Sequence, residues 1–211
     1  MLDDKIESNR TAHALMWSLL EAEFDRDVLG APPVELRALL RLEYGKSLPA
    51  TTRLPGAVPV FGSNGVTGAH NSALIDGPGV IVGRKGSVGE VHWSHAPSFP
   101  IDTTYFVSPV GGYPLLACYF ALLRAGLTAM NSHSAIPGLN RESALSARVE
   151  ALTVTTACGW AESRQCFLDQ IVHLERESSN LMCLRNTLLA ELLSGRVRVP
   201  EARDAVEEAV G

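Results

Sequence analysis

Two segments at opposite ends of the chain carry the same helical repeat, which constrains the fold more than any other feature. Positions spaced alternately by four and three residues in the first segment are Leu2, Ile6, Asn9, His13, Met16, Leu20 and Glu23/Phe24. The last segment keeps this spacing at Phe167, Ile171, Leu174, Ser178, Leu181, Arg185, Leu188 and Leu192. This is the period of a helix that presents a seam to a partner helix. We therefore predict two long helices that pair antiparallel.

The residues expected to make the pairing contacts are Leu2, Ile6, His13, Leu20, Ile171, Leu174, Leu181 and Leu188. The alternative is that both helices pack separately on the surface of one domain. Asn9 and His13 are polar members of the seam, and such residues restrict the register of a helix pair. Pro32-Pro33 ends the first helix, and Gly195 is the expected C-cap of the last one.

The region between the two helices is punctuated by Gly, Pro and Asn, as is typical of short strands joined by turns. Its apolar runs lie at 80–82, 91–93 and 105–107, and we predict a small, mostly antiparallel sheet. Residues 114–127 are apolar all round and predict a buried helix with a glycine stop. The expected fold is α+β, with an N-terminal helix over 1–31, a globular domain over 32–155, and a C-terminal helix and tail over 156–211.

A basic turn separates the first two predicted strands. In Gly83-Arg84-Lys85-Gly86-Ser87, glycines that allow close backbone approach flank two cations. The turn suits a phosphate, yet it lacks the GxxxxGK[ST] pattern of a nucleotide-hydrolysing loop. The alternative is an ordinary β-turn with two solvated cations.

The formal charge of −5 is unevenly distributed along the chain. Residues 34–150 contain nine Lys/Arg and seven Asp/Glu, whereas the remaining residues contain nine and sixteen. Since binding to nucleic acid depends on the field over one face, the acidity of the flanks does not exclude it. A second polar stretch, 131–141, is rich in hydrogen-bonding side chains and is typical of a recognition loop.

Other classes of protein find little support. The acidic, polar N-terminus is unlike a signal peptide, and with no run of eighteen apolar residues we expect a soluble, cytoplasmic protein. The four cysteines form no CxxC pair, and the spacing of His70, His92 and His95 does not favour a metal site. A catalytic set would have to be assembled from His92, His95, Ser98 and Asp102, whose spacing matches no known arrangement.

Four motifs, in order, resemble the target recognition domain of the DNA specificity (S) subunit of type I restriction-modification systems. They are VPVFGSNGVTGAH, GPGVIVGRKGSVGEVHW, FPIDTTYFV and SAIPGLNR. The segments LDDKIESNR and LRNTLLAELLSGRVRV resemble the conserved helical regions of that family. The resemblance covers roughly residues 2–199.

The resemblance implies a non-catalytic protein that reads one half of a split DNA target. It also implies docking to a methyltransferase subunit, which binds S-adenosylmethionine, and to a restriction (motor) subunit, while the chain itself binds no cofactor. An S subunit has two recognition domains, whereas this chain has one, so it is a half-size subunit or the C-terminal half of a split one. The chain lacks the Asn-Pro-Pro-Tyr/Phe motif of an amino-methyltransferase, which agrees with a non-catalytic role.

The residues that we expect to contact double-stranded DNA are Lys46, Ser63, Asn64, Arg84, Lys85, Thr103, Thr104, Tyr105, Ser132, His133, Asn140 and Arg141. Asp102 is expected to orient its loop instead, because an anion is repelled by phosphate. A different hypothesis is a helical adaptor whose β-rich domain binds protein. We also expect a homodimer formed through unpaired seam residues, the alternatives being a second half chain or a monomer whose helices pair with each other.

Overall fold

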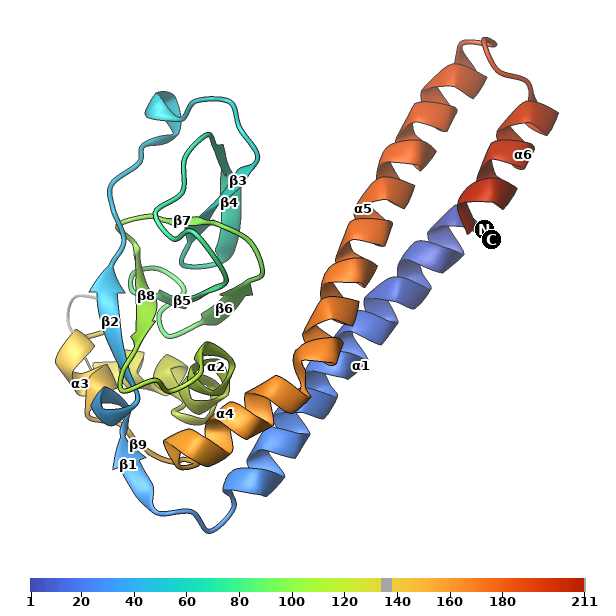
Figure 1. Ribbon diagram of the computed structural model, residues 1–211. Helices are drawn as coiled ribbons and strands as arrows, with labels where there is room; N and C mark the ends of the chain where they lie inside the picture. The colour runs from blue at the N-terminus through green and yellow to red at the C-terminus, as the bar shows by residue number, and fades with distance from the viewer. Residues whose placement is uncertain (134–137, 211) are drawn as a thin grey trace. The chain divides into compact units, whose positions relative to one another are not determined.

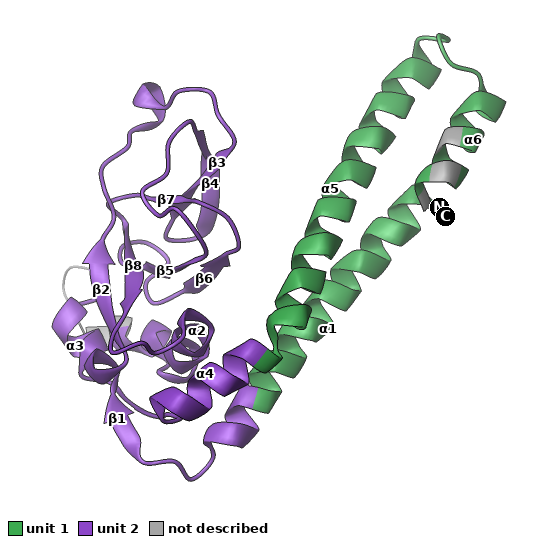
Figure 2. Cartoon of the chain, in the orientation of Figure 1, with its two compact units in different colours: residues 1–23, 163–211 green, residues 24–162 purple. Residues whose placement is uncertain are grey.

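The computed structural model describes residues 1–133 and 138–210, and it describes the side chains of all of these except 131–133, 205, 208 and 210. The chain forms two compact units, which Figure 2 shows in different colours. The central unit comprises residues 24–162, and the helical unit comprises residues 1–23 and 163–211. The central unit begins eight residues before the expected globular domain and ends seven residues after it, because it includes the end of the first helix and residues 156–162.

The main sheet of the central unit has four strands in the order β2 (Leu40–Tyr44), β8 (Thr104–Pro109), β5 (Gly79–Gly83) and β6 (Val91–Ser94). All neighbouring strands are antiparallel, which confirms the predicted sheet (Figure 1). Tyr44 and Val82 both lie opposite Tyr105, so β2 and β5 end where β8 begins. The chain segments that follow or precede these three strands therefore meet at one edge of the sheet.

Two smaller sheets complete the β structure. In the first, β3 (Val58–Gly62) lies between β4 (Gly65–His70) and β7 (Phe99–Pro100), antiparallel to β4 and parallel to β7. In the second, β1 (Pro33–Glu35) pairs antiparallel with β9 (Arg148–Glu150). The β3–β4 pair is a local hairpin, whereas the β3–β7 and β1–β9 pairs join segments far apart in the sequence, so the central unit depends on long-range contacts.

Helices cover the main sheet of the central unit. The predicted buried helix is α2 (Leu115–Arg124), which packs against β5, β6 and β8 and is followed by Gly126 in the left-handed region. The other helical elements are η1 (Leu36–Ala38), η2 (Ala50–Thr52), η3 (Leu127–His133), α3 (Arg141–Leu145) and α4 (Val154–Ser163). The end of the first helix also belongs here, because Phe24 is buried with its ring 5.5 Å from Phe120 and 5.1 Å from Trp160.

The helical unit is built on α1 (Leu2–Val28) and α5 (Gln165–Leu193), which pair antiparallel as predicted (Figure 1). Their contacts show the direction, because partners on α5 come earlier in the chain as one moves along α1. The contacts in order are Asp3 with Arg185 at 2.7 Å, Asn9 with Glu177 at 2.6 Å, His13 with Glu175 at 3.0 Å, and Glu23 with Arg164 at 3.1 Å. The pairing is made within one chain.

Most predicted seam residues are buried: Leu2, Ile6, Leu20, Ile171, Leu174 and Leu181, together with Asn9 and Ser178. His13 and Leu188 are half-buried. Only a tail was expected after Gly195, but residues 199–210 form a further helix, α6 (Val199–Val210). It returns towards α5, and Val206 packs on the cluster of Leu2, Ile6 and Leu181. None of the described helices is long and apolar enough to cross a membrane.

Candidate nucleic-acid interface

Three segments that carry predicted binding residues meet at one edge of the main sheet. Gly45, which follows β2, donates its N–H to the carbonyl of Thr104 at 3.1 Å. Arg84 and Lys85, which follow β5, donate theirs to the carbonyl of Thr103 at 2.9 and 3.1 Å. Lys46, Thr103, Arg84 and Lys85 thus lie on adjacent backbones. We refer to this edge as the basic edge. It also includes Ser63, Asn64, Tyr44 and Arg141, which are described next.

Two glycines allow the segments of the basic edge to approach this closely. A Cβ atom at Gly45 would lie 2.1 Å from the carbonyl oxygen of Ile101. A Cβ atom at Gly83 would lie 2.0 Å from the carbonyl oxygen of Ser87, across the basic turn. Both distances are far below van der Waals contact and both obstacles are backbone, so only glycine fits. The backbone positions of Lys46 and Arg84 therefore depend on the glycine that precedes each of them, Gly45 and Gly83.

The turn between β3 and β4 adjoins the basic turn. A Cβ atom at Gly86 would lie 3.1 Å from the Ser63 hydroxyl oxygen, and one at Gly83 would lie 3.0 Å from the Ser63 carbonyl oxygen. His92 makes a 3.1 Å hydrogen bond through Nε2 to the same carbonyl. Asn64, next in the turn, is exposed. The structure thus brings Ser63, with Asn64 beside it in the turn, next to the basic turn.

An aromatic side chain that the sequence analysis did not select lies at the centre of the basic edge. The guanidinium carbon of Arg84 is 5.0 Å from the centre of the Tyr44 ring, and that of Arg141 is 5.4 Å from it. Arg84 is also 5.8 Å from the ring of Tyr105 and donates from Nη1 to the carbonyl of Asp102 at 3.1 Å. These are cation–π geometries. The signal in the sequence that could have identified Tyr44 was its position directly before Gly45-Lys46, at the end of a strand.

The segment 138–141 is tied to the same place by backbone hydrogen bonds. Leu139 donates its N–H to the carbonyl of Arg84 at 2.8 Å, and the Tyr105 hydroxyl donates to the carbonyl of Leu139 at 3.0 Å. Asn140 is the N-cap of α3, where its side chain accepts from the N–H of Ser143. Arg141, the first residue of α3, is thereby held beside Tyr44.

Some predicted contact residues have supporting roles instead. Thr104 is fully buried and its hydroxyl donates to the carbonyl of Ile101 at 2.7 Å. Tyr105 is also buried; burial, with Tyr44 nearby, raises the pKa of its hydroxyl, while Arg84 opposes the shift. Both side chains therefore stabilise the basic edge from within and are not available for contact. Ser132 and His133 lie outside the residues whose side chains the structure describes.

The residues considered for catalysis do not form a catalytic arrangement. Ser98 is buried, while the ring of His95 accepts from the indole N–H of Trp93 at 3.0 Å. His92 is bound to the turn at Ser63, and Asp102 contributes its backbone carbonyl to Arg84. Among the described residues there is no group of three or more His, Cys, Asp or Glu that could hold a metal ion.

Neither His70 nor the buried cysteine offers a reactive group. His70 is buried, and its Nδ1 accepts from the N–H of Leu54 at 3.0 Å. Cys118 is buried in α2, and this burial raises the pKa of its thiol to about 12. The thiol therefore stays protonated at neutral pH, and Cys118 is a packing residue.

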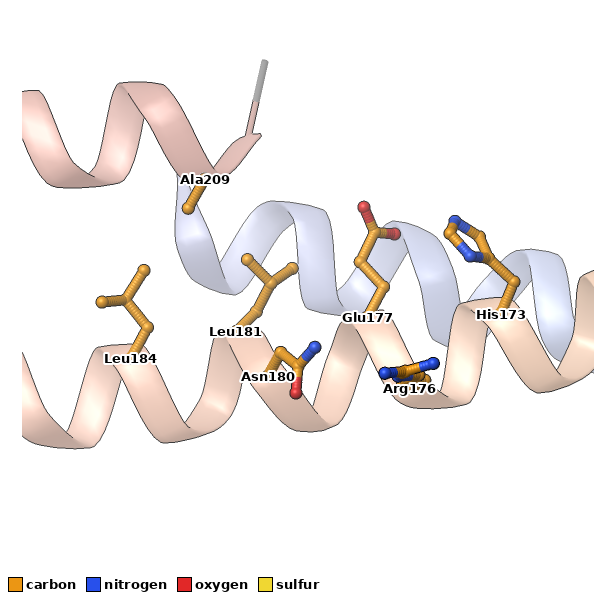
Figure 3. Close-up of a pocket in the computed structure, with 7 residues that line it drawn as sticks. All are labelled: His173, Arg176, Glu177, Asn180, Leu181, Leu184 and Ala209. Carbon is orange, nitrogen blue, oxygen red and sulfur yellow. The ribbon is translucent and has the colours of Figure 1, made fainter.

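A groove of about 520 Å³ lies between α5 and α6 in the helical unit (Figure 3). It is lined by His173, Arg176, Glu177, Asn180, Leu181, Leu184 and Ala209. Glu177 is already engaged by Asn9 and by Lys5. None of the residues that line the groove is a serine, threonine or cysteine nucleophile. We therefore take the basic edge as the candidate site.

Comparison with solved structures identifies the fold. The S subunit of a type I restriction-modification system from M. genitalium matches with a TM-score of 0.69 and 17% identity, over 90% of this chain and 57% of that one. The HsdS subunit from Thermoanaerobacter tengcongensis matches with a TM-score of 0.48 and 15% identity, over 90% and 55%. A chain from a study of the assembly and conformational transition of the type I R-M system matches with a TM-score of 0.49 and 11% identity, over 90% and 54%.

The chain is thus similar in fold to the S subunit from M. genitalium and spans 57% of the length of that chain. The similarity is one of fold. No protein-family model and no curated protein matches the sequence.

Proposed function

We propose that this chain is a non-catalytic DNA specificity subunit that reads half of a bipartite target for a type I restriction-modification complex. The basic edge carries the proposal, because it gathers Lys46, Arg84, Lys85 and Arg141 from three separate parts of the sequence. The S-subunit fold supports the same function. We propose that the central unit contacts the duplex and that the helical unit docks the methyltransferase and restriction subunits.

The chemistry of the basic edge suits double-stranded DNA. Arginine binds the guanine edge with two parallel hydrogen bonds, whereas a lysine ammonium on a flexible stem suits phosphate. Serine and threonine hydroxyls also bind phosphate, which is the proposed role of the half-buried Ser63 and Thr103. We propose Asn64 as a base contact, because its side chain is exposed in a turn beside the basic one.

A mobility-shift experiment with the cognate methyltransferase subunit tests the proposed function. We expect the complex to retain duplexes that contain its methylation target more strongly than random duplexes of the same length. Retention of neither would overturn DNA recognition and favour the protein-binding adaptor. Methylation or cleavage by this chain alone would overturn the non-catalytic assignment, since S-adenosylmethionine is expected to bind the methyltransferase subunit.

The proposed homodimer requires a surface other than the seam. Leu181 and Ile171 on α5 are already buried within one chain, so pairing with a second copy must use other apolar residues. Leu15 and Leu19, one helical turn apart on α1, are 65% and 46% exposed and are the proposed contact. Light scattering over a hundredfold range of concentration tests this, with Leu15→Asp as the dissociating variant. A constant monomer mass at the highest concentration would overturn the homodimer.

A further inference from the structure

We infer that Tyr44 is a positioning residue for base recognition, whose ring holds the Arg84 and Arg141 guanidiniums as a fixed set of donors for a guanine edge. The inference rests on the proposed function and deepens it. It adds a residue absent from the expected contacts, and it separates the arginines that read sequence from the lysines that bind phosphate.

Tyr44 is far more exposed than a residue whose role is to pack in the core. Its side chain is 50% exposed, although it ends a strand whose residues Leu40 and Leu42 are buried. Its ring lies 5.1 Å from the ring of Tyr105 and faces both Arg84 and Arg141. An arginine stacked on an aromatic ring loses little further freedom when it binds, because its plane is already oriented.

The backbones that carry the three side chains are tied together. Because Gly45 has no Cβ atom, the backbone directly after Tyr44 can lie against the Ile101 carbonyl, where any Cβ atom would collide. The hydrogen bond from Leu139 to the Arg84 carbonyl joins the segment of Arg141 to the basic turn. Residues from distant parts of the sequence are thereby held in one register, which a base-reading site needs and a diffuse electrostatic surface does not.

Arg84 is held at one end and retains donors for a ligand. Its Nη1 donates to the Asp102 carbonyl at 3.1 Å, and the guanidinium has five N–H donors in total. A planar group held by a ring and a carbonyl suits the two acceptors of guanine, O6 and N7. Lys85 is exposed at the next position of the turn, where its flexible ammonium can follow phosphate.

Selection from random duplexes, with the chain in complex with its methyltransferase subunit, tests the inference. Tyr44→Leu keeps an apolar side chain on the strand but removes the ring, and Tyr44→Phe restores the ring without the hydroxyl. We expect the Leu variant to lose preference at one position of the enriched motif by roughly tenfold. The Phe variant should enrich the wild-type motif, and Lys85→Ala should lower recovery of all duplexes without changing the motif.

A second measurement tests the geometry in the chain without DNA. Ring currents from Tyr44 should shift the Nε–H proton resonances of Arg84 and Arg141 in the wild-type chain, and the Phe variant should retain these shifts. Unshifted resonances, or a wild-type motif enriched by the Leu variant, would overturn the role of Tyr44 and leave DNA recognition standing. If the wild-type complex enriches no motif, the proposed function fails and this inference fails with it.

Discussion

The helical unit and the central unit depend on different kinds of contact. In the helical unit, a seam that repeats along each helix is buried by the same kind of seam on the other, so each residue's role follows from its place in the repeat. In the central unit, Tyr44, Arg84 and Arg141 come from one β-strand, one turn and one helix start, and no repeat relates them. The first arrangement tolerates exchange of similar side chains, while the second depends on a few positions.

The largest effect is expected from a charge in the seam of the helical unit. Ile171 is fully buried, so Ile171→Asp should lower the free energy of unfolding by about 3–5 kcal/mol. The adjacent Val172 is 40% exposed, and Val172→Asp should change the free energy of unfolding by less than about 0.5 kcal/mol. Urea unfolding followed by helical circular dichroism measures both. Equal effects of the two variants would show that the helices are not paired through the seam.

A smaller loss of stability is expected from glycine replacement at the basic edge. Gly45→Ala places a methyl group against the Ile101 carbonyl, and we expect a loss of about 3 kcal/mol because the obstacle is backbone. Gly77→Ala is the matched control, since nothing lies within 4 Å of a Cβ atom there. Thermal unfolding followed by tryptophan fluorescence measures both variants. A Gly45→Ala protein as stable as the control would mean that the strand end is not locked.

The two units also differ in how much of them could be predicted from the sequence. The paired helices followed from the spacing of Leu2, Ile6, Ile171 and Leu181, because a helical repeat is a local property of the chain. The antiparallel strands followed from short apolar runs between turn residues. Helix α6 was missed, although Ala202 and Val206 lie four residues apart on one face of it and Val206 packs on the cluster of Leu2, Ile6 and Leu181.

The basic edge could be predicted only in part. Arg84 and Lys85 stood out because they occupy a glycine-bounded turn, whereas Tyr44 did not, since its role depends on partners 40 and 97 positions away. Thr104 was expected to contact DNA because it is a polar residue in a motif. Burial of Thr104 is a consequence of strand pairing, which no local pattern encodes.

A binding measurement sharpens the comparison at the level of function. Lys85→Ala should lower the slope of log K against log salt concentration by about 1, because one phosphate contact is lost on every sequence. Arg84→Ala should weaken binding to the target by about 1–3 kcal/mol and affect random duplexes less. Arg203→Ala, which removes an exposed cation of α6, is the control and should change neither value. If all three variants behaved alike, general charge and not the basic edge would explain binding.

The smallest change in stability is expected at the polar member of the seam. Asn9 is buried, and its side-chain amide donates to the partly exposed Glu177 at 2.6 Å, so Asn9→Leu replaces one part-buried hydrogen bond with apolar packing. These effects oppose each other, and we expect the free energy of unfolding to change by less than about 1 kcal/mol. What should change is specificity, because a buried polar residue penalises shifted registers that a leucine tolerates.

Amide spectra and urea unfolding of the same variant separate the two effects. Doubled resonances for residues of α1 and α5, at nearly unchanged stability, would show that Asn9 selects the register of the helix pair. A single set of resonances with a loss above about 2 kcal/mol would show that the hydrogen bond to Glu177 stabilises the pair directly. In that case the helical unit, like the basic edge, would depend on an individual contact and not on its repeat alone.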